Sequence, residues 1–352
     1  MVEIFQDLVS YGHEQVSFFV DKESGLKAIV GIHSTTLGPS LGGCRMWNYS
    51  SESEALRDVL RLSRGMTYKA AVAGLKLGGG KAVIIGDARK DKSEALLKAF
   101  GRSVEMLAGR YYTAEDVGMS VKDMDVIRTQ TRFAVGGSNE GGSGDPSIMT
   151  AYGVFQGMKA AVKHAGLGED LEGLTVAVQG LGNVGHHLCS HLSAAGAKLI
   201  VADIHAPNVE SIVEQFGAKA VSPEEIISVE ADVFAPCALG AVLNARSVPT
   251  IKARVVAGAA NNQLETEEDG FELQRRGIVY APDYAINGGG LINVAAELEG
   301  YNKELVLSKV SNIKSTIASI LELATSENIP PHVAADRMAE QRLAAKRQLV
   351  KA

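Results

Sequence analysis

Residues 174–185 read LTVAVQGLGNVG, an apolar run followed at once by a glycine-rich turn. The glycines at 180, 182 and 185 have G-x-G-x-x-G spacing, and a helical stretch begins at the turn. The next apolar run, KLIVAD at 198–203, ends in Asp203, close to the ~20 residues that separate turn and acidic residue in dinucleotide-binding folds. The pattern predicts a dinucleotide site; a purely structural glycine turn is the alternative.

Each position of the turn has a physical reason. Gly180 permits the tight bend, Gly182 lets the backbone approach a pyrophosphate, and Gly185 allows close packing of helix on strand. The helix N-terminus supplies amide donors and a positive dipole. Asp203 can accept hydrogen bonds from ribose hydroxyls and would repel a 2′-phosphate, which favours NAD over NADP. The expected cofactor contacts in the turn are Gly180, Leu181, Gly182, Asn183, Val184 and Gly185.

Outward from this motif, apolar runs alternate with helical stretches. Further buried strands are expected at 232–236, 254–260 and 277–282, which predicts a doubly wound parallel sheet of the Rossmann type. The first 130 residues mix strands (27–34, 82–87) with helices (53–66, 93–107), and the tail is helical over 303–348. We therefore expect a two-domain α/β protein. The first predicted domain is an N-terminal α/β substrate domain at 1–134, onto which helices at 331–352 pack back. The second is a C-terminal NAD-binding domain at 135–330. The Gly- and Ser-rich segment 133–147 is expected to connect them.

Composition excludes several classes of protein. The 352 residues are 46% hydrophobic, enough for real cores, so a disordered chain is not expected. The net charge of −6 is a poor match for a protein that binds nucleic acid. The longest stretch without a charged residue, 173–197, contains Gln, Asn and His and does not resemble a membrane span. The chain begins MVEIFQD, which lacks the positive charge of a signal peptide.

The positions of the cysteines and histidines indicate neither a disulfide framework nor a metal site. Cys44, Cys189 and Cys237 lie far apart without a C-x-x-C pair, as in a protein of the reducing cytoplasm. Three histidines cluster at 186–191, but no carboxylate or second thiol completes an obvious ligand shell. No metal is expected, and the predicted location is cytoplasmic.

The segment GMTYKAAVAGLKLGGGKAVIIGD (65–87) carries two lysines around a glycine-rich bend. It is not a phosphate loop, because position 75 is Leu and position 82 is Ala where that motif needs Gly and Ser or Thr. Lys81 precedes a buried strand, where desolvation and a second cation favour the neutral amine, a base near neutral pH. Lys69 could stay charged and hold a substrate carboxylate. The alternative is two solvated surface lysines.

An acidic pair, Glu115 and Asp116, follows in YYTAEDVG at 111–118. One of these carboxylates could face the lysines and shuttle protons, or tune their protonation. The residues alone do not decide between this role and a solvated turn.

Taken together, these segments resemble the Glu/Leu/Phe/Val amino-acid dehydrogenase family, and its leucine dehydrogenases most, over almost the whole chain. The motifs that carry the resemblance are LGPSLGGCRMW (37–47), RGMTYKAAVAGLKLGGGKAVIIGD (64–87), YYTAEDVG (111–118), DVFAPCALGA (232–241), VVAGAANNQL (255–264) and APDYAINGGGLINVAAELEGYN (281–302).

The resemblance implies a role for each matching residue. Lys81 and Asp116 would be catalytic, and Lys69 would bind the substrate carboxylate. Asn261 would contact both substrate and nicotinamide. The other residues implied to contact the cofactor are Thr150, Cys237, Ala238 and Arg45. The residues implied to line the side-chain pocket are Leu41, Ala114, Leu291 and Val294.

The implied reaction is the NAD-dependent, reversible oxidative deamination of leucine, isoleucine and valine to 2-keto acids and ammonia. A glutamate side chain would enter the apolar pocket without a countercharge, which is costly. Leu291 stands where leucine dehydrogenases usually have Val, so an aromatic amino-acid dehydrogenase is the first alternative. A non-catalytic NAD-binding sensor is the second, and the joint presence of Lys69, Lys81 and Asp116 disfavours it. The resemblance also implies a homo-oligomer, an octamer or a dimer.

Overall fold

The computed structural model describes residues 4–138 and 142–351, which form two compact units. The first unit comprises Met1–Asp145, Asn293–Asn302 and Ala339–Ala352, and the second Pro146–Ile292 and Lys303–Met338, within the described residues. The sequence predicted a division at 134/135 and a return of the chain at 331. Residues 139–141 of the predicted connection and residue 352 of the predicted C-terminal helices lie outside the described residues.

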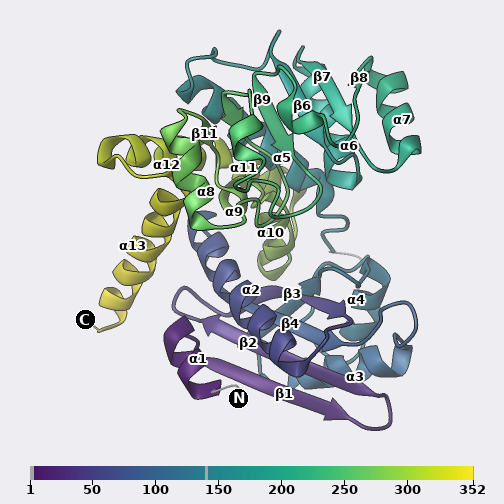
Figure 1. The fold of residues 1–352 in the computed structure, drawn as a ribbon. Helices are drawn as coiled ribbons and strands as arrows, with labels where there is room; N and C mark the ends of the chain where they lie inside the picture. The colour runs from purple at the N-terminus through teal and green to yellow at the C-terminus, as the bar shows by residue number, and fades with distance from the viewer. Residues whose placement is uncertain (1–3, 139–141, 352) are drawn as a thin grey trace. The chain divides into compact units, whose positions relative to one another are not determined.

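The first unit is built on a mixed five-stranded sheet with strand order β1-β2-β4-β3-β5 (Figure 1). Its strands are β1 (Gln15–Asp21), β2 (Leu26–Ser34), β3 (Ser40–Trp47), β4 (Gly78–Ile85) and β5 (Tyr111–Glu115), and its helices are α1 (Ile4–Tyr11), α2 (Glu52–Val72), α3 (Glu94–Glu105) and α4 (Val121–Arg128). Strand β3 lies between β4 and β5 and runs parallel to both. Three chain segments that are distant in sequence therefore end side by side.

The expected glycine bend before Lys81 is wrong: Gly78–Gly80 and Lys81 all lie in strand β4. The reason is close packing of helix α2 on this strand. A Cβ on Gly79 would stand 2.0 Å from the backbone nitrogen of Thr67 in α2, which no real Cβ tolerates. The glycines thus let a helix approach the strand, and Lys81 is held by a regular β-ladder, paired with Gly31 of β2.

This packing predicts a large difference between two glycine substitutions. Gly79→Ala forces α2 away from β4 and should lower the free energy of unfolding by about 3 kcal/mol, the upper range for overpacking. Gly65→Ala, within α2 and facing open space, should raise it by about 0.5–1 kcal/mol through helix propensity. Urea unfolding followed by circular dichroism measures both. Equal effects of the two variants would contradict the packing account.

The second unit contains the doubly wound sheet expected from the sequence, with six parallel strands in the order β11-β10-β9-β6-β7-β8 (Figure 1). The strands are β6 (Thr175–Gln179), β7 (Lys198–Ala202), β8 (Lys219–Ala220), β9 (Val233–Pro236), β10 (Val255–Val256) and β11 (Val279–Tyr280). The runs at 254–260 and 277–282 form shorter strands than expected, and β8 carried no recognisable apolar run.

The helices of the second unit surround this sheet, with α5 packed against α6 and α12. They are α5 (Ser147–His164), α6 (Asn183–Ala194), α7 (Ala206–Phe216), α8 (Glu267–Arg275), α9 (Asp283–Ile286), α11 (Lys303–Ser311) and α12 (Ile313–Glu327). Helices α10 (Gly289–Ala295) and α13 (Pro331–Lys351) each have residues in both units. The tail expected as one helical run is therefore three helices. No helix among the described residues is long and apolar enough to cross a membrane.

Within the first unit, the last part of α13 is tied to α2. Tyr68 donates a hydrogen bond from its hydroxyl to Glu340 Oε1 at 3.0 Å, and Arg342 donates to the carbonyl of Ala71 at 2.8 Å. This part of the C-terminal helix thus covers the helix that also carries Lys69.

Candidate active site and nucleotide-binding turn

Lys81 and Asp116 meet in the first unit, as the sequence suggested. Lys81 Nζ lies 2.9 Å from Asp116 Oδ2, and the lysine side chain is only 6% exposed. Asp116 follows β5 directly, on the far side of β3 from β4. It approaches β3 because residue 43 is glycine: a Cβ there would stand 2.7 Å from the Asp116 Cβ. The alternative of a solvated surface lysine does not hold for Lys81.

The Asp116 carboxylate is shared between two cations. Arg45 Nε donates to the same Oδ2 atom at 3.0 Å. Burial by itself would raise the pKa of Asp116, but the charges of Lys81 and Arg45 outweigh it and lower the pKa from 3.8 to about 2. Asp116 is therefore a fixed anion at neutral and alkaline pH. Its neighbour Glu115 differs, because burial and then nearby Asp145 raise the pKa of that carboxyl.

Arg45 is itself held by a second carboxylate, that of Asp58. Its Nη1 donates to Asp58 Oδ2 at 3.0 Å, and the same oxygen accepts the hydroxyl of Tyr49 at 2.7 Å. Burial and the bond to Asp58 raise the pKa of Tyr49, so the phenol remains a donor. The sequence singled out Arg45 only as a residue near the cofactor and missed Asp58 and Tyr49. No short motif joins these residues, because α2 and β3 bring them together through the fold.

Two more of the residues expected to bind substrate lie on strands of this sheet, and a third lies on a helix packed against it. Lys69 is half-buried in the last turn of α2, the helix packed on β4. Leu41 on β3 is 1% exposed and Ala114 on β5 is 9% exposed. Val294, also of the first unit, and Leu291, of the second, are buried as well. All four candidate pocket side chains are thus apolar and withdrawn from solvent.

In the second unit, the glycine turn has the geometry that its spacing predicted. Gly180 adopts φ +93°, and a Cβ on it would collide with Ala238 at 2.7 Å. A Cβ on Gly185 would stand 2.0 Å from the Gly180 carbonyl oxygen, so helix α6 can begin directly against the turn. Gly182, the N-cap residue of α6, faces open space. The free backbone at Gly182 and the first amides of α6, at Asn183 and Val184, suit an anionic group.

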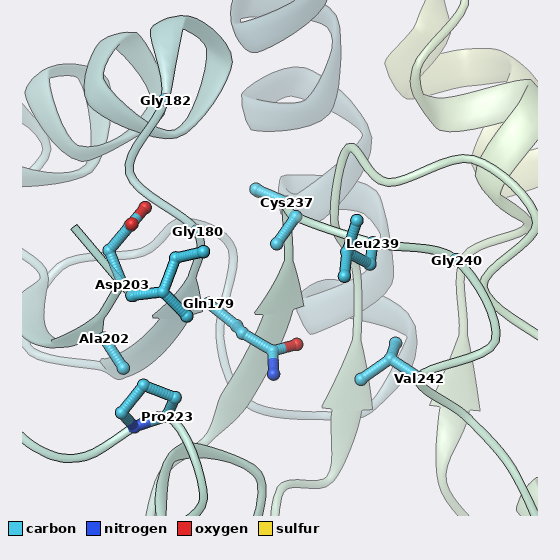
Figure 2. A pocket seen from close by; sticks show the side chains of 12 residues that line it. Gln179, Gly180, Gly182, Ala202, Asp203, Pro223, Cys237, Leu239, Gly240 and Val242 are labelled. Carbon is cyan, nitrogen blue, oxygen red and sulfur yellow. The ribbon is translucent and has the colours of Figure 1, made fainter. Parts of the chain in front are cut away.

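A cavity of about 510 Å³ opens beside this turn (Figure 2). Figure 2 shows the Asp203 carboxylate beside the turn that leads to Gly182. Asp203 Oδ2 accepts from the amide of Leu181 at 2.5 Å, and Oδ1 from the amide of His205 at 2.8 Å. The cavity is lined by Gln179, Gly180, Gly182, Ala202, Asp203, Ile204, Pro223, Cys237, Ala238, Leu239, Gly240 and Val242. The candidates Cys237 and Ala238 are among them, whereas Gln179, Ile204, Pro223, Leu239 and Val242 were not anticipated.

These residues fit a nicotinamide dinucleotide. The turn leaves room for a pyrophosphate where a Cβ is missing, and Asp203 offers carboxylate oxygens to ribose hydroxyls. The Oε1 atom of Gln179 is buried beside the cavity without a hydrogen-bond partner, so it can accept from a bound molecule. The exposed apolar side chains Ile204 and Leu239 flank the cavity and suit the faces of a flat aromatic base.

Two further candidates lie on loops and helix ends of the second unit. Thr150, in the first turn of α5, donates its hydroxyl to the Pro146 carbonyl at 2.9 Å. Asn261 is exposed, and its Oδ1 accepts from Asn287 Nδ2 at 2.8 Å. The amide of Asn287 is buried and also donates to the Ala259 carbonyl. Asn261 is therefore oriented with its amide nitrogen left to donate elsewhere.

Comparison with known families places both units. Residues 13–133 match the family model described as Glu/Leu/Phe/Val dehydrogenase, dimerisation domain. Residues 141–206 and 201–349 match the model of Glutamate/Leucine/Phenylalanine/Valine dehydrogenase. The two models together cover nearly the entire chain.

Individual relatives agree with these matches. The chain is 58% identical to leucine dehydrogenase of Geobacillus stearothermophilus over 343 residues, 97% of this chain and 94% of the relative. It is 50% identical to valine dehydrogenase of Streptomyces albus over 95% of this chain and 93% of the relative. Among solved structures, L-tryptophan dehydrogenase from Nostoc punctiforme has a TM-score of 0.86 at 45% identity and covers 98% of this chain and 99% of its own.

Proposed function

Because the chain belongs to the Glu/Leu/Phe/Val dehydrogenase family, we propose that it catalyses the reversible, NAD-dependent oxidative deamination of leucine, isoleucine and valine. The observation that carries this proposal is the buried amine of Lys81, bonded to the carboxylate of Asp116. A protein that only sensed NAD would have no use for this pair. The relatives named leucine and valine dehydrogenase support the same substrate class.

In this proposal, bound NAD supplies the acceptor for the hydride that leaves the substrate α-carbon. Lys69 holds the substrate carboxylate. Lys81, as a neutral amine, takes a proton from the water that attacks the resulting iminium carbon. Asp116 then pairs with the ammonium of Lys81 and helps return that proton to the leaving amine. As the C–N bond breaks and ammonia departs, Lys81, neutral again, takes the proton of the carbinolamine hydroxyl, and a 2-keto acid remains; the same amine thus serves as proton acceptor and donor.

The apolar lining supports aliphatic over acidic substrates. A glutamate side chain would be desolvated among Leu41, Ala114 and Val294 without a countercharge. One methylene discriminates by only ~1–3 kcal/mol, so activities on leucine, isoleucine and valine should overlap. An aromatic amino-acid dehydrogenase is the second candidate, and the 45% identity to an L-tryptophan dehydrogenase favours it.

The family implies a nicotinamide cofactor, and Asp203 supports NAD in particular. Its carboxylate is fixed at the cavity by the amides of Leu181 and His205, where a 2′-phosphate would meet a negative charge. The match to a dimerisation domain supports a homo-oligomer. The three free cysteines support a cytoplasmic location.

A substrate panel with both cofactors tests the proposal. We expect NADH formation at alkaline pH with L-leucine, L-isoleucine and L-valine, with kcat/KM values within about 200-fold of one another. L-phenylalanine should react more slowly, L-glutamate not measurably, and NADP should replace NAD poorly. A higher kcat/KM for aromatic substrates would establish the second candidate. No NADH with any aliphatic or aromatic L-amino acid would refute both.

A further inference from the structure

Behind Asp116 lies a row of alternating charges that the proposed reaction does not yet use. Asp116 Oδ2 accepts from Arg45 at 3.0 Å, and Arg45 in turn bonds to Asp58 at 3.0 Å. Asp58 is fixed from two more sides, by the Tyr49 hydroxyl at 2.7 Å and by Arg61 at 3.2 Å. The side chains of Arg45 and Asp58 are only 23% and 15% exposed, so solvent screens their charges weakly.

Arg45 differs from Lys81 in one chemical respect. A guanidinium stays charged throughout the pH range in which enzymes work, whereas an amine can release its proton. When Lys81 gives up its charge to act as a base, Asp116 would lose one of its two cations. Arg45 then remains as a permanent partner of Asp116. Asp58 accepts from Arg45 Nη1 and so keeps the planar guanidinium oriented with its Nε donating to Asp116.

We propose that Arg45 is a positioning residue for Lys81: held by Asp58, it shares the Asp116 oxygen that Lys81 also contacts and so weakens the ion pair that would otherwise keep Lys81 an ammonium. The inference rests on the proposed function, because it concerns the same base. The Arg45 and Lys81 nitrogens contact one oxygen, so the two cations repel each other and compete for the same anion.

Other charges around the carboxylate do not supply this effect. Several titratable or charged groups act on this region from the surrounding elements. Among the described residues they include Cys44 and Arg45 of β3, Lys81 of β4, Tyr111 and Glu115 of β5, Asp58 and Arg61 of α2, Tyr49 after β3, Lys92 before α3, Asp123 of α4 and Asp145. Burial raises the pKa of the Cys44 thiol, so it is uncharged. Lys92 is already paired with Asp123 at 2.8 Å.

The test is the pH profile of L-leucine oxidation in Arg45→Gln, Asp58→Asn and a matched control. In Arg45→Gln we expect the ascending limb of kcat/KM to move about one pH unit to the alkaline side, a loss of about tenfold on that limb. On the alkaline plateau the loss should be much smaller. Asp58→Asn should shift the limb in the same direction by less. Arg45→Lys keeps the charge and should shift it less than Arg45→Gln.

Arg61→Gln is the matched control, because Arg61 also bonds to Asp58 but is 54% exposed and does not contact Asp116 or Lys81 among the described contacts. The ascending limb of the pH profile should not move in this variant. An equal loss at every pH in Arg45→Gln, with an unmoved limb, would overturn the inference in favour of a structural role. A raised KM for NAD with an unmoved limb would instead assign Arg45 to the cofactor. If Arg45→Gln does not fold, the position of the ascending limb in Asp58→Asn tests the inference instead: an alkaline shift supports it and an unmoved limb overturns it. Wild-type protein without amino-acid oxidation would refute the proposed function itself.

Discussion

Lys81→Ala should lower kcat for L-leucine oxidation by about 10³- to 10⁴-fold, near the upper range for loss of a general base. The substitution removes the amine that is bonded to Asp116, and Arg45, the other cation on the same oxygen, stays charged and cannot act as a base in its place. Binding of NADH should change little, because the glycine turn and its cavity are built entirely from the second unit. Steady-state NADH formation and fluorescence titration with NADH measure the two quantities.

The matched control is Lys76→Ala. Lys76 lies on the same segment, five residues before Lys81, but its side chain is exposed. Its removal should leave kcat within about twofold, as expected for a surface position. Comparable losses in the two variants would mean that the segment as a whole, and not the buried amine, supports turnover.

Asp116→Asn should lower kcat by about 10²- to 10³-fold while leaving the affinity for NADH unchanged. The amide keeps the size of the carboxylate but removes the charge shared by Lys81 and Arg45, so two cations would face each other without an anion between them. Because the pKa of Asp116 is about 2, its carboxylate is ionised at every pH of the assay and adds no limb of its own to the profile. The loss is therefore measured on the alkaline plateau, where a shift of the ascending limb does not contribute.

The same pKa fixes the sign of an effect on stability. A carboxyl whose pKa is lower in the folded than in the unfolded protein stabilises the fold above about pH 4, and this contribution is lost as the pH falls towards 2. Asp116→Asn should lack this acid dependence. Asp87→Asn, which removes a half-exposed carboxylate paired with Lys90, is the control for the activity measurement and should keep its activity. Full activity of Asp116→Asn would remove this residue from the mechanism.

The glycine turn was predictable because its signals are local. An apolar strand, three glycines at fixed spacing and a downstream acidic residue lie within residues 174–203, and the structure shows the strand, the turn and the helix in that order. Asp203 was expected to face a ribose. The structure adds that Leu181 and His205 hold its carboxylate, which depends on backbone amides that no residue pattern reveals.

In the first unit, local signals were weaker. Gly78–Gly80 suggested a bend because glycine is usually read as a turn former, whereas here small size matters and conformational freedom does not. Strands β1, β3 and β5 were missed. The pairing of β3 and β5 depends on residues far apart along the chain, whereas β1 pairs with the next strand, β2. The contact between Arg45 and Asp58 arises in the same way and was invisible for that reason.

The most direct test of the central claim, that a hydride leaves the substrate α-carbon in a site served by Lys81, is a single turnover with L-leucine deuterated at that carbon. Enzyme in excess over substrate is mixed with NAD in ordinary water, and the NADH formed is examined by mass spectrometry. We expect one deuterium per NADH and, in the same time, 2-keto acid from the wild-type protein but not from Lys81→Ala. Deuterium released into water, or equal 2-keto acid from both proteins, would contradict the claim.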